Sequence, residues 1–130
     1  PLSYFLSLLF ALTQVSVQWS SPECRNPTLM GYFSTGTDTI TVCKENAKSV
    51  NETLKHEYVH WVYDQKGPDF TPIPEPLLTD LTRVFLSSQE TLTVILATQS
   101  YPSEEEFSAR LISMLPDPLF VVWAVFSLAG

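Results

Sequence analysis

The chain has 130 residues, of which 45% are hydrophobic and 12% aromatic; this favours one packed domain over residues 1–130 and excludes a disordered protein. Fourteen acidic and seven basic residues give a net charge of −7, so the chain lacks the positive surface that nucleic-acid binding needs. We therefore expect no nucleic-acid partner. Composition predicts neither an oligomeric state nor a cellular location.

Both ends of the chain are apolar. Residues 2–12 resemble the core of a signal peptide, but they have no basic lead-in and no clear small-residue cleavage site. Residues 119–129 are shorter than the roughly 20 residues of a membrane span. We expect two buried helices, over residues 2–14 and after Asp117-Pro118, with secretion or membrane binding as the less favoured interpretation.

Three strands are expected next. Residues 15–19 alternate between apolar and polar side chains, residues 29–33 form a second apolar run, and residues 39–43 are rich in β-branched side chains. A turn over residues 34–38 predicts a hairpin between the second and third strands. Together these segments predict a small three-stranded sheet in an α+β fold.

The two cysteines, Cys24 and Cys43, leave two interpretations open. They could form one disulfide bond, or both could remain reduced and buried. Their spacing resembles no metal-binding framework, so we do not expect them to be zinc ligands.

Capping residues mark a central helix. Ser49 followed by Glu52 forms a capping box, and Gly67-Pro68 is a typical helix end, which predicts a helix from residue 50 to about residue 65. Further along, we expect a proline-rich loop over residues 69–76, a helix over about 77–99, and another that begins after a second capping box at Ser103 and ends near residue 115.

The central helix carries the most informative motif, His56-Glu57-Tyr58-Val59-His60, and these two histidines are the only ones in the chain. Residues four apart lie on one helical face, so His56 and His60 can bind the same ion. Zinc lowers the pKa of a bound water to about 7, and a carboxylate at Glu57 would act as the general base. The motif predicts metal-assisted hydrolysis with zinc as the cofactor and a peptide or protein as the substrate.

A catalytic zinc site usually takes three protein ligands, so a carboxylate must complete the set. The candidates are Asp64, Glu75, Glu90 and the run Glu104 to Glu106. Asp64 lies about 12 Å along the helix from His56, which favours a supporting role such as orienting His60. Glu75 and Glu90 lie in polar surroundings typical of solvated charges.

Glu106 is the preferred third ligand. On a helical wheel it shares a face with Ala109 and Ser113, whose small side chains would let a second helix approach closely. The opposing interpretation is that Glu106 only caps the helix at Ser103. The same helix has a large apolar stripe, made by Phe107, Leu111, Met114 and Leu115.

Residues 30–64 resemble a family of small zincin metallopeptidases. The order and spacing of Met30-Gly31-Tyr32, Ile40 to Cys43 and Thr53 to His60, with Asp64 beyond, are similar to those of the mitochondrial metalloproteases that process an ATP-synthase subunit. The segment Glu106 to Ile112 is similar to the E-x-x-A-N-x-F segment of ImmA/IrrE-type metallopeptidases, in which the glutamate is the third zinc ligand. Arg110 replaces the asparagine of that segment.

These resemblances imply a gluzincin-type endopeptidase with a minimal zincin-like fold, in which a small sheet covers the active-site helix and a second helix brings the third ligand. An exposed edge strand, Thr39 to Val42, would pair with an extended peptide. Tyr58, Tyr63 and Tyr101 are candidate donors to the oxyanion, although packing in the core is the commoner role.

The competing interpretation is a non-catalytic zinc-binding scaffold or regulatory protein, whose apolar termini bind a partner or a membrane. The sequence favours the enzyme, because a structural zinc site is normally closed by four ligands and has no use for Glu57.

Overall fold

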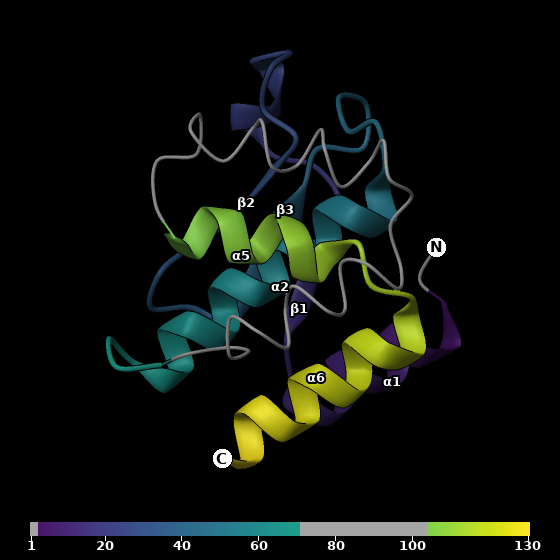
Figure 1. The fold of residues 1–130 in the computed structure, drawn as a ribbon. Coiled ribbons are helices and arrows are strands. Elements are labelled where there is room, and N and C mark those ends of the chain that lie inside the picture. The colour runs from purple at the N-terminus through teal and green to yellow at the C-terminus, as the bar shows by residue number, and fades with distance from the viewer. Residues whose placement is uncertain (1–2, 71–103) are drawn as a thin grey trace.

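A computed structural model describes residues 3–70 and 104–130 (Figure 1). The helix expected over residues 77–99, the candidate ligands Glu75 and Glu90, the cap at Ser103 and Tyr101 lie outside these residues. The described part contains four α-helices, one short 3₁₀ helix and a three-stranded mixed sheet. It therefore has the α+β architecture that the sequence predicts.

Helix α2 (Val50–Lys66) lies at the centre of the fold. Its beginning is fixed as expected, because the Ser49 hydroxyl accepts a hydrogen bond from the backbone N–H of Glu52. It ends at Gly67, whose φ of 88° is a conformation that side chains disfavour. The sheet packs against α2, and so do helices α5 and α6 (Figure 1). The backbone of α2 is thus fixed from several sides.

The sheet consists of β1 (Ser16–Gln18), β2 (Gly31–Phe33) and β3 (Thr39–Val42), in the order β1-β3-β2. The expected hairpin is present, since β2 pairs antiparallel with β3, and β1 joins β3 in parallel. Strand β3 is therefore central, and the expectation that Thr39 to Val42 form an exposed edge was wrong. The reason lies in burial: Ile40, Thr41 and Val42 are all buried, as suits a strand flanked on both sides.

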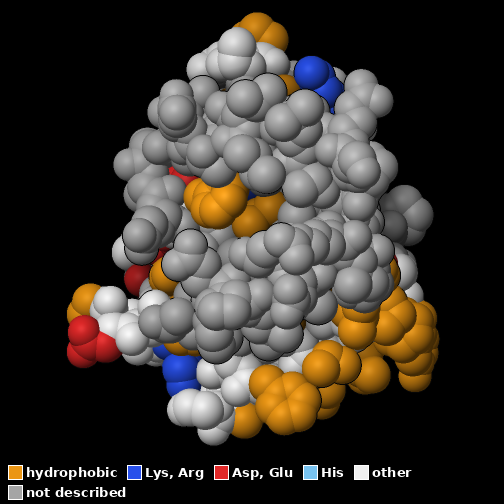
Figure 2. Space-filling model, viewed as in Figure 1, with side chains coloured by type: hydrophobic (Ala, Val, Ile, Leu, Met, Phe, Trp, Pro, Cys, Tyr) orange, Lys and Arg blue, Asp and Glu red, His pale blue; other side chains and the backbone are white. Residues whose placement is uncertain are grey.

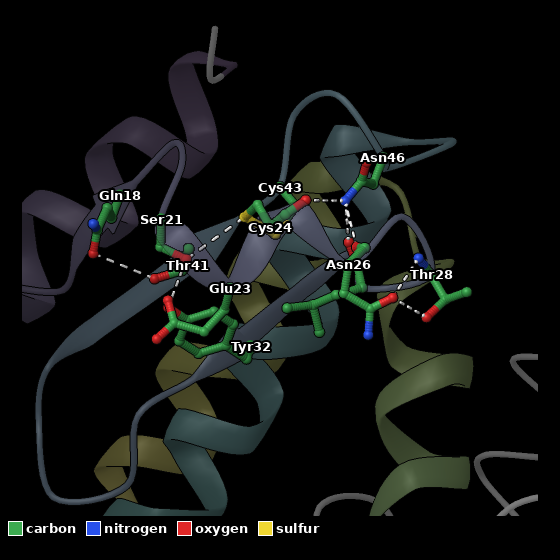
Figure 3. The surroundings of a disulfide bond; sticks show 11 residues. Gln18, Ser21, Glu23, Cys24, Asn26, Thr28, Tyr32, Thr41, Cys43 and Asn46 are labelled. Carbon is green, nitrogen blue, oxygen red and sulfur yellow. Dashed lines mark hydrogen bonds between the residues drawn. A yellow bond between two sulfur atoms is a disulfide. The ribbon is translucent and has the colours of Figure 1, made fainter.

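A disulfide bond resolves the question that the sequence left open for the cysteines. Cys24, in the 3₁₀ helix Pro22–Arg25, is bonded to Cys43 at the end of β3 (Figure 3). Next to it, the side-chain amide of Asn46 donates to the carbonyl oxygens of Cys24, Asn26 and Leu29. The bond and the amide hold the loop before β2 against the end of β3.

Helices α1 (Tyr4–Thr13) and α6 (Asp117–Ala129) pack side by side at one end of the fold (Figure 1). Each contributes three side chains to the core, but each also exposes a row of large apolar side chains. The expectation that both terminal helices are buried was therefore only half right. Within the described residues, no helix is both long and apolar enough to cross a membrane.

Helix α5 (Glu104–Ser113) packs against α2, as its small residues predict. Ala109 and Ser113 are both fully buried, which brings the two helix backbones close together. On the same helix Leu111 is buried as part of the expected apolar stripe, whereas Phe107 is only partly buried. The face of α5 that carries Glu106 is thus directed at the helix that carries both histidines.

Candidate metal centre

The three predicted ligands meet between α2 and α5. His56 and His60 lie one turn apart on α2, and their Nε2 atoms are 3.2 Å from each other. The carboxylate of Glu106 lies 3.0 Å from Nε2 of His56 through Oε2 and 2.8 Å from Nε2 of His60 through Oε1. The three side chains form a group whose donor atoms all lie within 4.8 Å of one another.

The donor set fits a divalent metal ion. Zinc with bonds of about 2.0 to 2.2 Å in a tetrahedral site has ligand atoms about 3.3 Å apart, close to the spacing of the three donors. Two imidazole nitrogens and one carboxylate are also a ligand set that zinc takes in catalytic sites. The spacing and the chemistry of the three donors are therefore suited to a divalent metal ion.

Each ring nitrogen of His60 lies within hydrogen-bond distance of a carboxylate oxygen. Its Nδ1 lies 2.5 Å from Oε2 of Glu105, and its Nε2 faces Glu106. A neutral imidazole has a single N–H and so cannot donate to both carboxylates. If a neutral ring donates from Nδ1 to Glu105, the lone pair of Nε2 faces a carboxylate oxygen, and either a proton or a metal ion at Nε2 would remove that repulsion.

The surroundings of His56 favour its neutral form. Burial lowers the pKa of His56 below its ordinary value, and the neighbouring charge of His60 acts in the same direction, while Glu106 opposes them. A neutral imidazole is the form that binds a metal ion. The site thus keeps this donor available around neutral pH.

Glu57 lies on the β2 side of the metal centre. Burial raises the pKa of Glu57 to about 7; the charge of His60 opposes this shift, as does a hydrogen bond from the backbone of Phe33, and the charge of Glu106 adds to it. The carboxyl group of Glu57 thus lies within electrostatic range of His60 and Glu106. The bond from Phe33 places it beside β2 as well.

The outer edge of β2 faces this carboxyl group. The carbonyl oxygen of Met30 accepts a hydrogen bond from Cys43, and the N–H of Ser34 donates to Thr39, so Met30 and Ser34 face β3. Successive residues of an antiparallel strand alternate in direction, so Gly31 and Phe33 direct their N–H and C=O groups away from β3. A Cβ atom at Gly31 would come within 2.9 Å of the Thr53 side chain on α2. The same Cβ would come within 2.7 Å of the backbone oxygen of Thr41, so glycine lets β2 lie close to both β3 and α2.

Asp64 does not orient His60, which corrects the supporting role expected for it. It is exposed on α2, and Glu105 occupies the Nδ1 position of His60 instead. Glu105 was expected only as a fallback third ligand, and its contact with Nδ1 was not foreseen. The pair Glu105-Glu106 is the sequence signal for this arrangement, because two adjacent carboxylates on one helix can reach two sides of the same imidazole.

One of the candidate oxyanion donors, Tyr58, lies in the core and not at the metal centre. Tyr58 is buried in the core, where its hydroxyl donates to Thr13 and burial raises its pKa to about 12. Tyr63 packs its ring against Phe70. Tyr58 therefore has the structural role that the sequence analysis favoured, and Tyr101 lies outside the described residues.

Arg110, which replaces the asparagine of the resembling segment, has its own partner on α2. Its guanidinium lies 3.6 Å from the carboxylate of Glu52. Both side chains are more than one third exposed, so the pair contributes little to stability.

The chain matches no protein-family model, no curated protein and no solved structure. The assignment of a function therefore rests on the residues of the site itself.

Proposed function

We propose that the protein is a zinc-dependent hydrolase that cleaves peptide bonds. The observation that carries this proposal is the meeting of His56, His60 and Glu106 from two helices, with the carboxyl group of Glu57 beside them. Three protein ligands leave a fourth position for water, which is typical of catalytic rather than structural zinc sites.

Zinc is proposed because of the ligand types. Two imidazoles and one carboxylate suit zinc better than magnesium or calcium, which prefer oxygen ligands. When bound, zinc supplies a water of lowered pKa and polarises the substrate carbonyl. The ligands His56, His60 and Glu106 would hold the ion, and Glu105 would hold the ring of His60 in the orientation that directs Nε2 inward.

Glu57 is proposed as the general base. Its carboxylate would accept the proton of the attacking water and pass it to the leaving amine, the two transfers that peptide hydrolysis requires. Its position supports this role, because Glu57 interacts with His60 and Glu106 without being one of the three clustered donors. A site that only bound a metal would not need this carboxyl group.

The outer edge of β2 is the proposed docking edge for the substrate, in place of β3. The N–H and C=O groups of Gly31 and the C=O group of Phe33 point to that edge, where an extended peptide can pair by strand addition; the N–H of Phe33 already donates to Glu57. Because Phe33 also contacts Glu57, a peptide paired there would pass beside the proposed base. An extended peptide segment is therefore the substrate that this geometry favours.

The alternative function is a non-catalytic zinc-binding scaffold or regulatory protein. It would use the same ligands without turnover, and the exposed apolar faces of α1 and α6 are the observation in its favour. Coordination number distinguishes the two functions, because a structural site has four protein ligands and a catalytic one has three and a water.

The test is reconstitution of the full chain with zinc. After chelation and dialysis, the protein should bind about one zinc ion, since one ligand set is assembled, and the metal should restore cleavage of an unfolded casein substrate. X-ray absorption at the zinc edge should fit two imidazoles, one carboxylate and a water. Stoichiometric zinc with four protein ligands and no cleavage would favour the scaffold, and failure to bind zinc would exclude both functions.

A further inference from the structure

Helices α1 and α6 together form an exposed apolar surface. All eight large hydrophobic side chains that are exposed within residues 3–70 and 104–130 belong to these two helices. We call this surface the α1/α6 face; it consists of Tyr4, Phe5, Leu8, Leu12, Leu119, Val122, Val125 and Phe126. Figure 2 shows apolar side chains gathered along the edge of the molecule where the two helices lie.

The residues of this face follow helical periodicity. On α1 the exposed positions 4, 5, 8 and 12 fall within about 100° of the helix circumference, and on α6 positions 119, 122, 125 and 126 fall within about 120°. Because α1 and α6 pack against each other, both stripes lie at the same end of the molecule.

The α1/α6 face also lacks charge. Neither helix contains a lysine or arginine, and the one acidic residue, Asp117, is bonded to Lys55 at the start of α6. The net charge of −7 therefore lies on other parts of the molecule. A partner for this face must be apolar and uncharged over the same area, as a second copy of the face itself is.

The size of the face matches what a stable dimer needs. With total areas of about 150 to 250 Å² for the aromatic side chains and somewhat smaller areas for leucine and valine, the exposed fractions leave on the order of 700 Å² of apolar surface. A monomer rarely exposes more than about 300 to 600 Å² in one patch. A standard protein interface buries about 800 Å² on each partner.

We propose that the protein forms a twofold symmetric dimer through the α1/α6 face. Two helices from each copy would pack into a four-helix arrangement, in which each α1/α6 face covers the other. The histidines and Glu106 lie between α2 and α5, so the inference does not depend on the proposed activity. Each copy would carry its own metal centre.

A lipid surface is the main competing occupant, and the chemistry of the helices disfavours it. Helices that lie on membranes usually carry lysine and arginine beside their apolar face, where these residues meet lipid phosphates. Both helices lack such residues, and an acidic chain is repelled by anionic lipids.

The experiment measures the mass of the full chain by sedimentation equilibrium over a range of concentrations. Interfaces of this size have dissociation constants of micromolar or below, so the parent should be dimeric at about 10 μM and above. Leu12→Glu and Phe126→Glu change side chains that are 72% and 75% exposed, so both variants should fold. Each should weaken the dimer at least tenfold, because a carboxylate would be buried without a partner.

Gln65→Glu is the matched control, because it adds the same single charge at an exposed position of α2 and should leave the dimer unchanged. Added salt should strengthen the parent dimer, since it screens the repulsion between two acidic chains but not the apolar contact. A monomeric parent at all concentrations would overturn the proposal, as would glutamate variants that remain dimeric. So would a monomer that co-sediments with phosphatidylcholine vesicles, which would assign the face to lipid.

Discussion

The imidazole of His60 lies between two carboxylates of α5, with Glu105 at Nδ1 and Glu106 at Nε2. The two contacts have different consequences. A carboxylate at Nδ1 fixes the tautomer and the ring orientation, which leaves Nε2 directed at the ligand position. The neighbouring carboxylate completes the donor set. Of the two adjacent residues, Glu106 is thus a candidate ligand and Glu105 supports another, His60.

Glu105→Ala should weaken zinc binding by about 10- to 100-fold, the usual effect of removing a group that supports a metal-bound histidine. Glu105→Gln should recover most of that loss, because the amide oxygen still accepts the hydrogen bond from Nδ1. Competition with a chelator of known zinc affinity measures both values. Equal affinity in the alanine variant and the parent would show that the contact does not support the ligand.

Glu106→Ala should abolish stoichiometric zinc binding, because it removes one of three donors from the set. Asp64→Asn is the control: it also removes one carboxylate, but the side chain is exposed on the same helix as the histidines, so zinc affinity should stay within about twofold of the parent. If Asp64→Asn instead lost as much affinity as Glu106→Ala, the assignment of the third ligand would be wrong.

At this scale, the sequence predicts the residues that helical periodicity brings together. His56 and His60 follow from their spacing of four, and the small residues Ala109 and Ser113 indicate that Glu106 faces another helix. The contact of Glu105 could not be predicted, because a helical wheel gives directions around one helix and not the ring nitrogen that a neighbour on another helix reaches.

At the scale of elements, a buried ion pair joins α2 to α6. The ammonium group of Lys55 is buried, lies 3.1 Å from a carboxylate oxygen of Asp117, and donates to the carbonyl oxygen of Leu115. Asn51 also donates to Asp117. Burial alone would raise the pKa of Asp117, but hydrogen bonds from Ser3, Asn51 and Lys55 outweigh it, so the pKa is lowered overall.

Asp117→Ala should destabilise the protein by about 3 kcal/mol at pH 7, near the lower end for breaking a buried pair, because the carbonyl of Leu115 still accepts from Lys55. Urea denaturation measures the difference. Asp69→Ala, at an exposed position, should change stability by less than about 0.5 kcal/mol. A similar small change in Asp117→Ala would mean that the pair does not tie the helices together.

The difference in stability between the parent and Asp117→Ala should depend on pH. Because the folded protein lowers the pKa of Asp117 below its ordinary value of 3.8, the carboxylate stabilises the fold above that value. The stabilisation is lost as the pH falls through the lowered pKa of the folded state. The difference between parent and Asp117→Ala should therefore shrink below about pH 4.

Element positions were predictable where capping residues mark them, as at Ser49 and Gly67. The order of the strands was not, because alternating side chains indicate which face of a strand is buried but not which strands lie beside it. That is why β3 (Thr39–Val42) was expected at an edge and is central. The pairing of Cys24 with Cys43 was likewise undetermined, since a spacing of 19 residues permits a bond without requiring it.

At the scale of the whole molecule, the α+β class followed from the strands and the helices that the sequence marks. The exposure of α1 and α6 did not follow, because a short apolar segment has the same composition whether one or all of its sides are covered. The metal centre lies away from that surface, between α2 and α5. The fold thus separates the cluster of His56, His60 and Glu106 from the exposed apolar face of α1 and α6.

The central claim, zinc-dependent hydrolysis with Glu57 as the base, is tested most directly by Glu57→Gln in the zinc-loaded chain. The amide keeps the size of the side chain but cannot accept the proton, so peptide cleavage should fall by about 10²- to 10⁴-fold. Because Glu57 is not one of the clustered donors, the variant should still bind one zinc ion. Full cleavage activity in a variant with bound zinc would contradict the account.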